Sequence, residues 1–166
     1  MKPIAQAGFV GFGEVNTPRE FIDHRCAAAA AELEKRGIAL HATMPVSDDP
    51  AGEQVARAIA ELKKGEFDAL ILCVAGWIPS WAVLRIAEEF KHLPLVLWGL
   101  SGWRDGSRFM TTADQAGTTA LRAPLTEQGY TFRYIVNFRD AEPRYDEVAD
   151  YLRAASARTR LRRSLL

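Results

Sequence analysis

Tryptophan, arginine and amide side chains follow directly after several short apolar runs of this sequence. Those that could bind a ligand are Asn16, Arg19, Trp77, Trp81 and Trp103. A tryptophan offers a flat apolar face and one N–H donor, which suits the CH surface of a sugar or the surface of a second subunit. The same positions are equally consistent with Trp77 and Trp81 only covering the end of a sheet. Both interpretations are open at this point.

The segment after the first apolar run begins like a dinucleotide-binding loop but departs from that pattern. Gly11 and Gly13 match the first two glycines of GxGxxG. The third glycine position holds Asn16, the carboxylate of Glu14 would repel a pyrophosphate, and Pro18 starts the next helix too late. Glu14 and Pro18 also disfavour a flavin phosphate loop, which needs small hydroxyl residues. We therefore expect neither a nicotinamide nor a flavin cofactor.

Metal-binding and nucleophilic residues are scattered along the chain. His24, His41 and His92 fall on different expected elements, so no three or four ligands recur at the spacing of a metal site. Cys73 lies in the most apolar run, where burial would make its thiol inert. Cys73 and Cys26 are the two cysteines, and they suit a reducing cytosol as free thiols. We expect no metal site in this chain and assign no catalytic residue.

Five apolar runs alternate with helical patterns, which is typical of a doubly wound parallel sheet. The runs are residues 8–13, 38–44, 68–75, 94–98 and 131–138. The third and fourth are apolar throughout, as in central strands that helices cover on both faces. The second and fifth alternate between polar and apolar residues, as in edge strands. With right-handed crossovers, these features predict a three-layer α/β fold of the flavodoxin-like type, with strand order 2-1-3-4-5.

Capping residues and prolines predict where the helices begin. The expected starts are Thr17, Asp49, Pro79, Thr112 and Pro143. Pro124 is expected to kink or shorten the fourth helix because proline cannot donate a hydrogen bond inside a helix. In a sheet of this type ligands bind at the carboxyl ends of the strands, which is where the tryptophans and Arg19 would lie.

Length and composition exclude several classes of protein. The chain has 166 residues, 48% hydrophobic and 25% charged, which indicates one globular domain. Lys plus Arg and Asp plus Glu both total 21, so we expect neither nucleic acid nor a membrane as a partner. The sequence has no long apolar span, and its first residues hold Gly and Glu where a signal peptide would need an apolar stretch, so we expect a cytoplasmic protein. The arginine-rich residues 153–163 are typical of a solvated helix, or of a chain that passes into a second domain.

Several segments in order resemble a known family. They read VGFGEVNTPREF, PVSDD, DALILCVAGWIPSWAVL, LVLWGLSGW, TTADQAGTTALRAPL and FRYIVNF. Together they resemble the N-terminal domain of the L-fucose and L-arabinose isomerase superfamily, over residues 9–162. The resemblance implies a part of an oligomeric aldose–ketose isomerase whose active sites lie at subunit boundaries. It also implies that Mn²⁺, used by the full-length family enzymes, is held by later domains and not by this chain.

The resemblance leads to one functional expectation and two alternatives. We expect an N-terminal isomerase domain that is catalytically incomplete alone, assembles as a homo-oligomer and encloses a sugar substrate at a subunit boundary. Asn16, Arg19, Trp77, Trp81 and Trp103 are the expected substrate-binding residues. The first alternative is a freestanding module that binds a sugar-like molecule without converting it. The second is a fold isolated or engineered for its own study.

Overall fold

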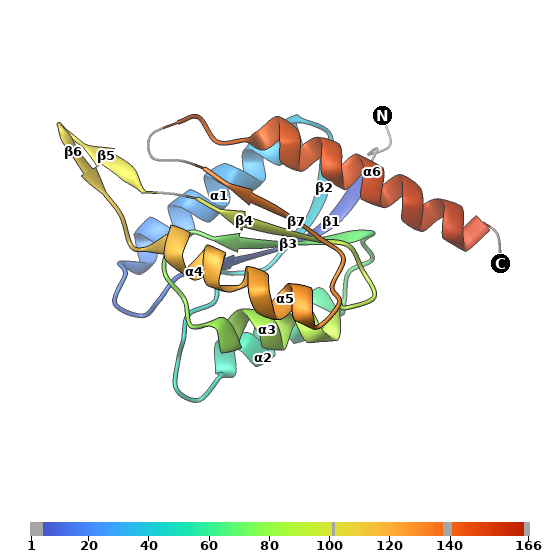
Figure 1. The fold of residues 1–166 in the computed structure, drawn as a ribbon, viewed down its shortest axis with the longest axis horizontal. Coiled ribbons are helices and arrows are strands. Elements are labelled where there is room, and N and C mark those ends of the chain that lie inside the picture. Colours follow the sequence, from blue (N-terminus) through green and yellow to red (C-terminus); the bar gives the residue numbers. More distant parts are fainter. Residues whose placement is uncertain (1–4, 101, 138–140, 165–166) are drawn as a thin grey trace.

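The computed structural model describes residues 5–100, 102–137 and 141–164, without the side chains of residues 103, 163 and 164. Its elements are, in chain order, β1 (Ala5–Phe12), α1 (Arg19–Lys35), β2 (Ile38–Ala42), α2 (Glu53–Leu62), β3 (Ala69–Val74), α3 (Ser80–Glu89), β4 (Leu95–Gly99), β5 (Trp103–Asp105), β6 (Arg108–Met110), α4 (Asp114–Ala120), α5 (Arg122–Glu127), β7 (Phe132–Val136) and α6 (Tyr145–Ser164). Helices α1 and α6 cover one face of the main sheet, and α2 to α5 cover the other (Figure 1). The structure therefore has the three layers expected from the sequence.

The main sheet is parallel, with strand order β2-β1-β3-β4-β7. Since β7 is its fifth strand, the predicted order 2-1-3-4-5 is confirmed. All six residues of β3 are buried, whereas β2 and β7 are partly exposed. The burial follows from position, because a central strand has neighbours on both edges and helices on both faces.

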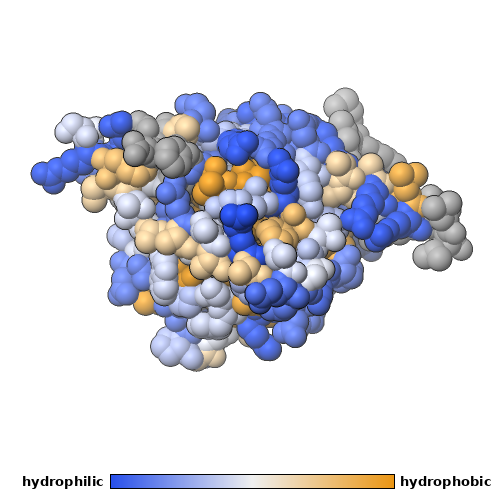
Figure 2. Space-filling model, in the orientation of Figure 1, coloured by the Kyte–Doolittle hydropathy of each residue, from blue (hydrophilic) through white to orange (hydrophobic). Residues whose placement is uncertain are grey.

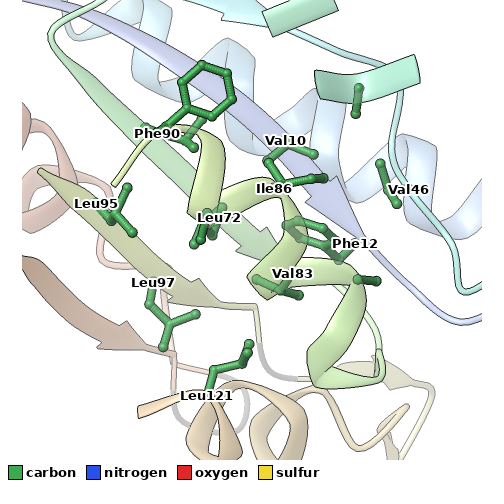
Figure 3. Close-up of a cluster of buried hydrophobic side chains, with 14 of the residues drawn as sticks. Val10, Phe12, Val46, Leu72, Val83, Ile86, Phe90, Leu95, Leu97 and Leu121 are labelled. Atoms are coloured by element: carbon green, nitrogen blue, oxygen red, sulfur yellow. The ribbon is translucent and has the colours of Figure 1, made fainter. Parts of the chain in front are cut away.

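The two faces of the sheet carry separate apolar cores. Alternate residues of β3 point to opposite faces, so Leu70 and Leu72 pack with α2 and α3 while Ile71 and Cys73 pack with α1 and α6. Figure 3 shows the first of these cores, in which Leu72 lies among side chains from β1, β4 and α3. Each face is therefore closed by its own layer of helices.

Most helices begin near the predicted residue, with differences at the caps. Helix α1 starts at Arg19 after Pro18, without a side-chain cap from Thr17. The carboxylate of Asp49 accepts hydrogen bonds from the backbone N–H of Glu53 (2.7 Å) and of Gln54 (3.3 Å). Asp49 therefore bonds the first turn of α2 as predicted, although Gly52 holds the N-cap position and α2 begins only at Glu53.

The fourth predicted helix is two short helices. Helix α4 ends at Ala120, and α5 begins at Arg122. Pro124 lies in the first turn of α5, where a missing N–H costs little. The prediction that Pro124 shortens the helix is confirmed, and the physical reason is that Pro124 cannot donate to the Ala120 carbonyl. The start differs from the prediction, because Ala113, with φ of 55°, precedes the helix in place of Thr112.

The antiparallel hairpin of β5 and β6 was not predicted from the sequence. It projects from the carboxyl end of the main sheet, at the left of Figure 1. Gly106 at its turn has φ of 58°, which suits glycine. The dipeptide Asp105-Gly106 is a known hairpin signal, but strands of three residues are too short to show a periodic pattern.

None of the helices in the described ranges combines the length and the apolar content that a membrane crossing requires.

Candidate functional site

Backbone hydrogen bonds connect the loops at the carboxyl ends of β1, β2, β3 and β6. The N–H of Gly13 donates to the Val46 carbonyl (3.1 Å), and that of Glu14 donates to the Trp77 carbonyl (2.7 Å). The N–H of Trp77 in turn donates to the carbonyl of Thr112 (3.0 Å). These loops therefore form one connected platform in which side chains keep defined positions.

A cleft of about 880 Å³ opens at this edge, between the β1–α1 loop and the β2–α2 loop. We call it the carboxyl-edge cleft. Its lining contains three carboxylates, two guanidinium groups, two amides, two hydroxyls and five apolar residues, namely Glu14, Asp23, Glu53, Arg19, Arg57, Asn16, Gln54, Thr17, Ser47, Gly13, Val15, Pro18, Ile22 and Met44. The volume is within the range of about 300 to 1,000 Å³ that is typical of small-molecule sites.

Arg19 connects the two sides of the cleft. Its Nε donates to Asp23 Oδ1 (2.8 Å), its Nη1 to Gln54 Oε1 (3.2 Å) and its Nη2 to the carbonyl of Pro45 (2.7 Å). Arg57 donates to the same Pro45 carbonyl from its Nη2 (3.1 Å). A guanidinium has five N–H donors, so Arg19 can hold these groups and still face a ligand.

The β1–α1 loop is also fixed by a carboxylate from the β2–α2 loop. Asp48 Oδ1 accepts a hydrogen bond from the backbone N–H of Val15 (2.8 Å). Asp48 and Asp49 are adjacent acidic residues of this loop, and the carboxylate of each accepts a hydrogen bond from a backbone N–H. Their carboxylates therefore shape the cleft.

The predicted binding residues fall in three places. Asn16 and Arg19 lie together in the lining of the carboxyl-edge cleft. Trp77 follows β3 and Trp81 is in the first turn of α3, with exposed fractions of 36% and 43%, and neither lines the cleft. Trp103 begins β5, and its side chain is outside the described part of the structure. A shared binding role for all five residues stays a prediction.

A buried acidic residue near the same edge was missed by the sequence reasoning. Asp114 is the first residue of α4 and is completely buried. Its Oδ1 accepts hydrogen bonds from Thr111 Oγ1 (3.3 Å) and from the backbone N–H of Gln115 (3.0 Å). Arg25 Nη1 of α1 lies 3.8 Å from its Oδ2. A lone aspartate at a helix start is common in sequences, so no signal distinguished this one.

Burial determines the titration of Asp114. It raises the pKa of this carboxyl from 3.8 to about 6, because a charged group is disfavoured away from water. The positive charge of Arg25 and the hydrogen bonds from Gln115 and Thr111 act in the opposite direction, and more weakly. Asp114 is therefore a buried acid that changes protonation near neutral pH.

The two cysteines are free and buried in the core between β3 and α1. Burial is the main reason that the pKa of the Cys73 thiol is well above its ordinary value. In the described part of the chain, no three His, Cys, Asp or Glu side chains come together in a group that could hold a metal ion.

Compared with known protein families and with curated proteins, this chain matches no family model and no curated sequence. The fold class thus follows from the sheet order and the helical layers, and a function has to be argued from the site.

Proposed function

We propose that this chain is an N-terminal domain of the sugar-isomerase type, which binds a small neutral polyhydroxylated molecule in the carboxyl-edge cleft and is catalytically incomplete alone. The proposal is supported by the ordered segments that resemble the L-fucose and L-arabinose isomerase superfamily and by the position of the cleft. Open α/β sheets bind their ligands at the carboxyl ends of the strands.

The observation that carries the proposal is the mixture of polar groups in the cleft. A sugar hydroxyl both donates and accepts hydrogen bonds, so its site needs both kinds of partner. Arg19 and Arg57 only donate, Asp23 and Glu53 accept, and Asn16 does both. Three carboxylates face two guanidinium groups, and this near balance of charge favours a neutral ligand over a phosphate or a polycation.

A second subunit would complete the enclosure of such a ligand. Six of the seven large apolar side chains that are exposed among the described residues lie at the carboxyl edge of the main sheet, in its loops, at the start of α3 or in the β5–β6 hairpin, namely Val15, Met44, Trp77, Trp81, Phe109 and Met110. We call them the apolar rim. Grouped apolar side chains on a surface typically mark a contact with another protein. The apolar rim therefore supports a homo-oligomer whose subunits meet at this edge.

Titration calorimetry with L-fucose and L-arabinose tests the binding step. We expect the two sugars to bind and Asn16→Ala to weaken their binding about fivefold, as for the loss of one hydrogen bond of about 1 kcal/mol. Gln128→Ala is the matched control, because Gln128 is an exposed amide that does not line the cleft. No heat of binding for either sugar, or equal effects of the two variants, would contradict the proposal.

Sedimentation and an activity assay test the other two parts. We expect Trp77→Ala combined with Trp81→Ala to reduce self-association, since both side chains belong to the apolar rim. Unchanged sedimentation would contradict an oligomer that forms through the apolar rim, and it would favour a freestanding binding module. We also expect no aldose–ketose isomerisation by this chain with added Mn²⁺, and turnover above the buffer rate would show that the domain is not incomplete.

A further inference from the structure

A second cleft, of about 220 Å³, lies at the opposite edge of the sheet, near the amino ends of β4 and β7. Its polar lining is Lys91, His92, Thr131, Arg158, Thr159 and Arg162, and we call it the basic cleft. These residues come from the α3–β4 turn, the residue before β7 and the last turns of α6. Figure 2 shows hydrophilic side chains next to apolar ones where the end of α6 projects from the body, at the right.

The charge of the basic cleft is of one sign. Lys91, Arg158 and Arg162 are cationic, His92 adds an imidazole, and no carboxylate is among the lining residues. In the described part of the chain, Arg158 and Arg162 form no ion pair with an acidic side chain. The contrast with the carboxyl-edge cleft is clear, because there carboxylates and guanidinium groups are nearly balanced.

The nearest buried acid is already neutralised by its own partners. Asp68, at the entry to β3, is buried and accepts a short hydrogen bond from Ser156 Oγ. Arg160 Nε lies 3.5 Å from the same carboxylate oxygen. The negative charge of Asp68 is therefore paired with Arg160 of α6, and the electrostatic potential in the basic cleft stays positive.

The same contacts give the cleft a defined shape. Ser156 and Thr159 of α6 bond to Asp68, the latter through the Asp68 backbone carbonyl (3.3 Å). Arg158 and Arg162 are one helical turn apart, so they lie on one face of the helix that these bonds fix. Lys91 Nζ is held 5.2 Å from the centroid of the Tyr130 ring. The anchored helix and the held Lys91 side chain therefore lose less conformational freedom when an anion binds than a free segment would.

We propose that the basic cleft is an anion site for a phosphate group, either inorganic phosphate or the phosphate of a small phosphomonoester. Guanidinium groups bind phosphate oxygens with paired N–H donors, and the hydroxyl of Thr131 can add another donor. The volume is below the range of about 300 to 1,000 Å³ that is typical of whole small molecules, so the cleft suits a single charged group. The formal net charge of zero disfavours recruitment of a polyanion such as nucleic acid. This site is separate from the proposed sugar cleft, and neither proposal depends on the other.

A titration followed by backbone amide NMR at constant ionic strength tests the site. Inorganic phosphate is the first probe and glucose 6-phosphate the second, with chloride as the reference anion. We expect saturable shifts of residues 91–93, 131 and 158–162, and no such shifts with chloride. Tighter binding of the phosphomonoester than of inorganic phosphate would assign the ester as the ligand, and equal binding would assign the free anion.

Charge variants decide whether the cleft itself binds the anion. We expect Arg158→Gln and Arg162→Gln each to weaken phosphate binding about tenfold, which is about 1.4 kcal/mol. Arg85→Gln is the matched control, because Arg85 is an exposed arginine of α3 outside the basic cleft. Shifts that do not saturate, or an equal loss in the Arg85 variant, would overturn the proposal. Binding to vesicles of anionic lipid or to a single-stranded oligonucleotide through the same residues, without phosphate binding, would also overturn it.

Discussion

Replacing Asp114 with asparagine should remove a specific pH dependence from the stability of this domain. The carboxyl of Asp114 is completely buried, and its pKa is raised from 3.8 to about 6. The folded protein therefore holds this proton more tightly than the unfolded chain does. The resulting stabilisation is complete below about pH 3.8 and is lost as the pH rises through about 6.

The magnitude follows from the two pKa values. One pKa unit corresponds to about 1.4 kcal/mol, so the difference between 3.8 and about 6 is about 3 kcal/mol in the free energy of unfolding. About 2 kcal/mol of this change falls between about pH 4.5 and about pH 8, because the unfolded carboxyl is already mostly ionised at the lower value. Asp114→Asn cannot ionise, so its free energy of unfolding lacks this contribution.

Urea denaturation of both proteins at these two pH values measures the effect. Between the lower and the higher pH, the free energy of unfolding of the wild type should fall by about 2 kcal/mol more than that of Asp114→Asn. Any cost of placing the amide beside Arg25 is the same at both pH values and cancels in this comparison. Asp105→Asn, on the exposed hairpin, should follow the wild type. Parallel pH profiles for wild type and Asp114→Asn, within about 0.5 kcal/mol, would refute a buried carboxyl that titrates near pH 6.

Three further substitutions, the first with a control variant, test the packing and one helix cap by the same urea method. Leu72→Ala should lower the free energy of unfolding by about 2 to 5 kcal/mol, because Leu72 is fully buried, whereas the exposed Leu161→Ala should change it by less than about 0.5 kcal/mol; similar effects of the two would contradict the core assignment. Gly11→Ala should cost about 1 to 3 kcal/mol, since the added Cβ would lie 2.3 Å from Cys26 Sγ, and a neutral result would contradict this close packing. Asp49→Ala should cost about 1 kcal/mol through loss of its bonds to the first turn of α2, and an unchanged midpoint would argue against the cap.

The order of the sheet could be predicted because the hydrophobic pattern is a direct consequence of burial. A strand that helices cover on both faces is apolar throughout, as in ALILCV of β3, and an edge strand contains polar residues and is only partly buried, as in β2 and β7. The cap at Asp49 and the break before Pro124 are also local, since each depends on residues within one or two turns. The hairpin was missed because its strands have only three residues.

The binding residues could be predicted only in part, because a loop's place in the chain does not say which neighbour it faces. Position after a strand was enough to place Asn16 and Arg19 at the carboxyl edge. It did not show that the cleft opens on the side of this edge between α1 and α2, where Trp77 and Trp81 do not line it. That side is set by the bond between Arg19 and Gln54, which are 35 residues apart.

Residue types and their periodicity were thus sufficient for the fold class, the strand order and several helix ends, since these depend on which face of each element avoids water. The hollow between α1 and α2, the burial of Asp114 beside Arg25, and the cluster of cations beside the end of α6 depended on the folded chain. Each of these features joins residues from elements distant in sequence, and their distances and exposure to water exist only after the helices have packed on the sheet.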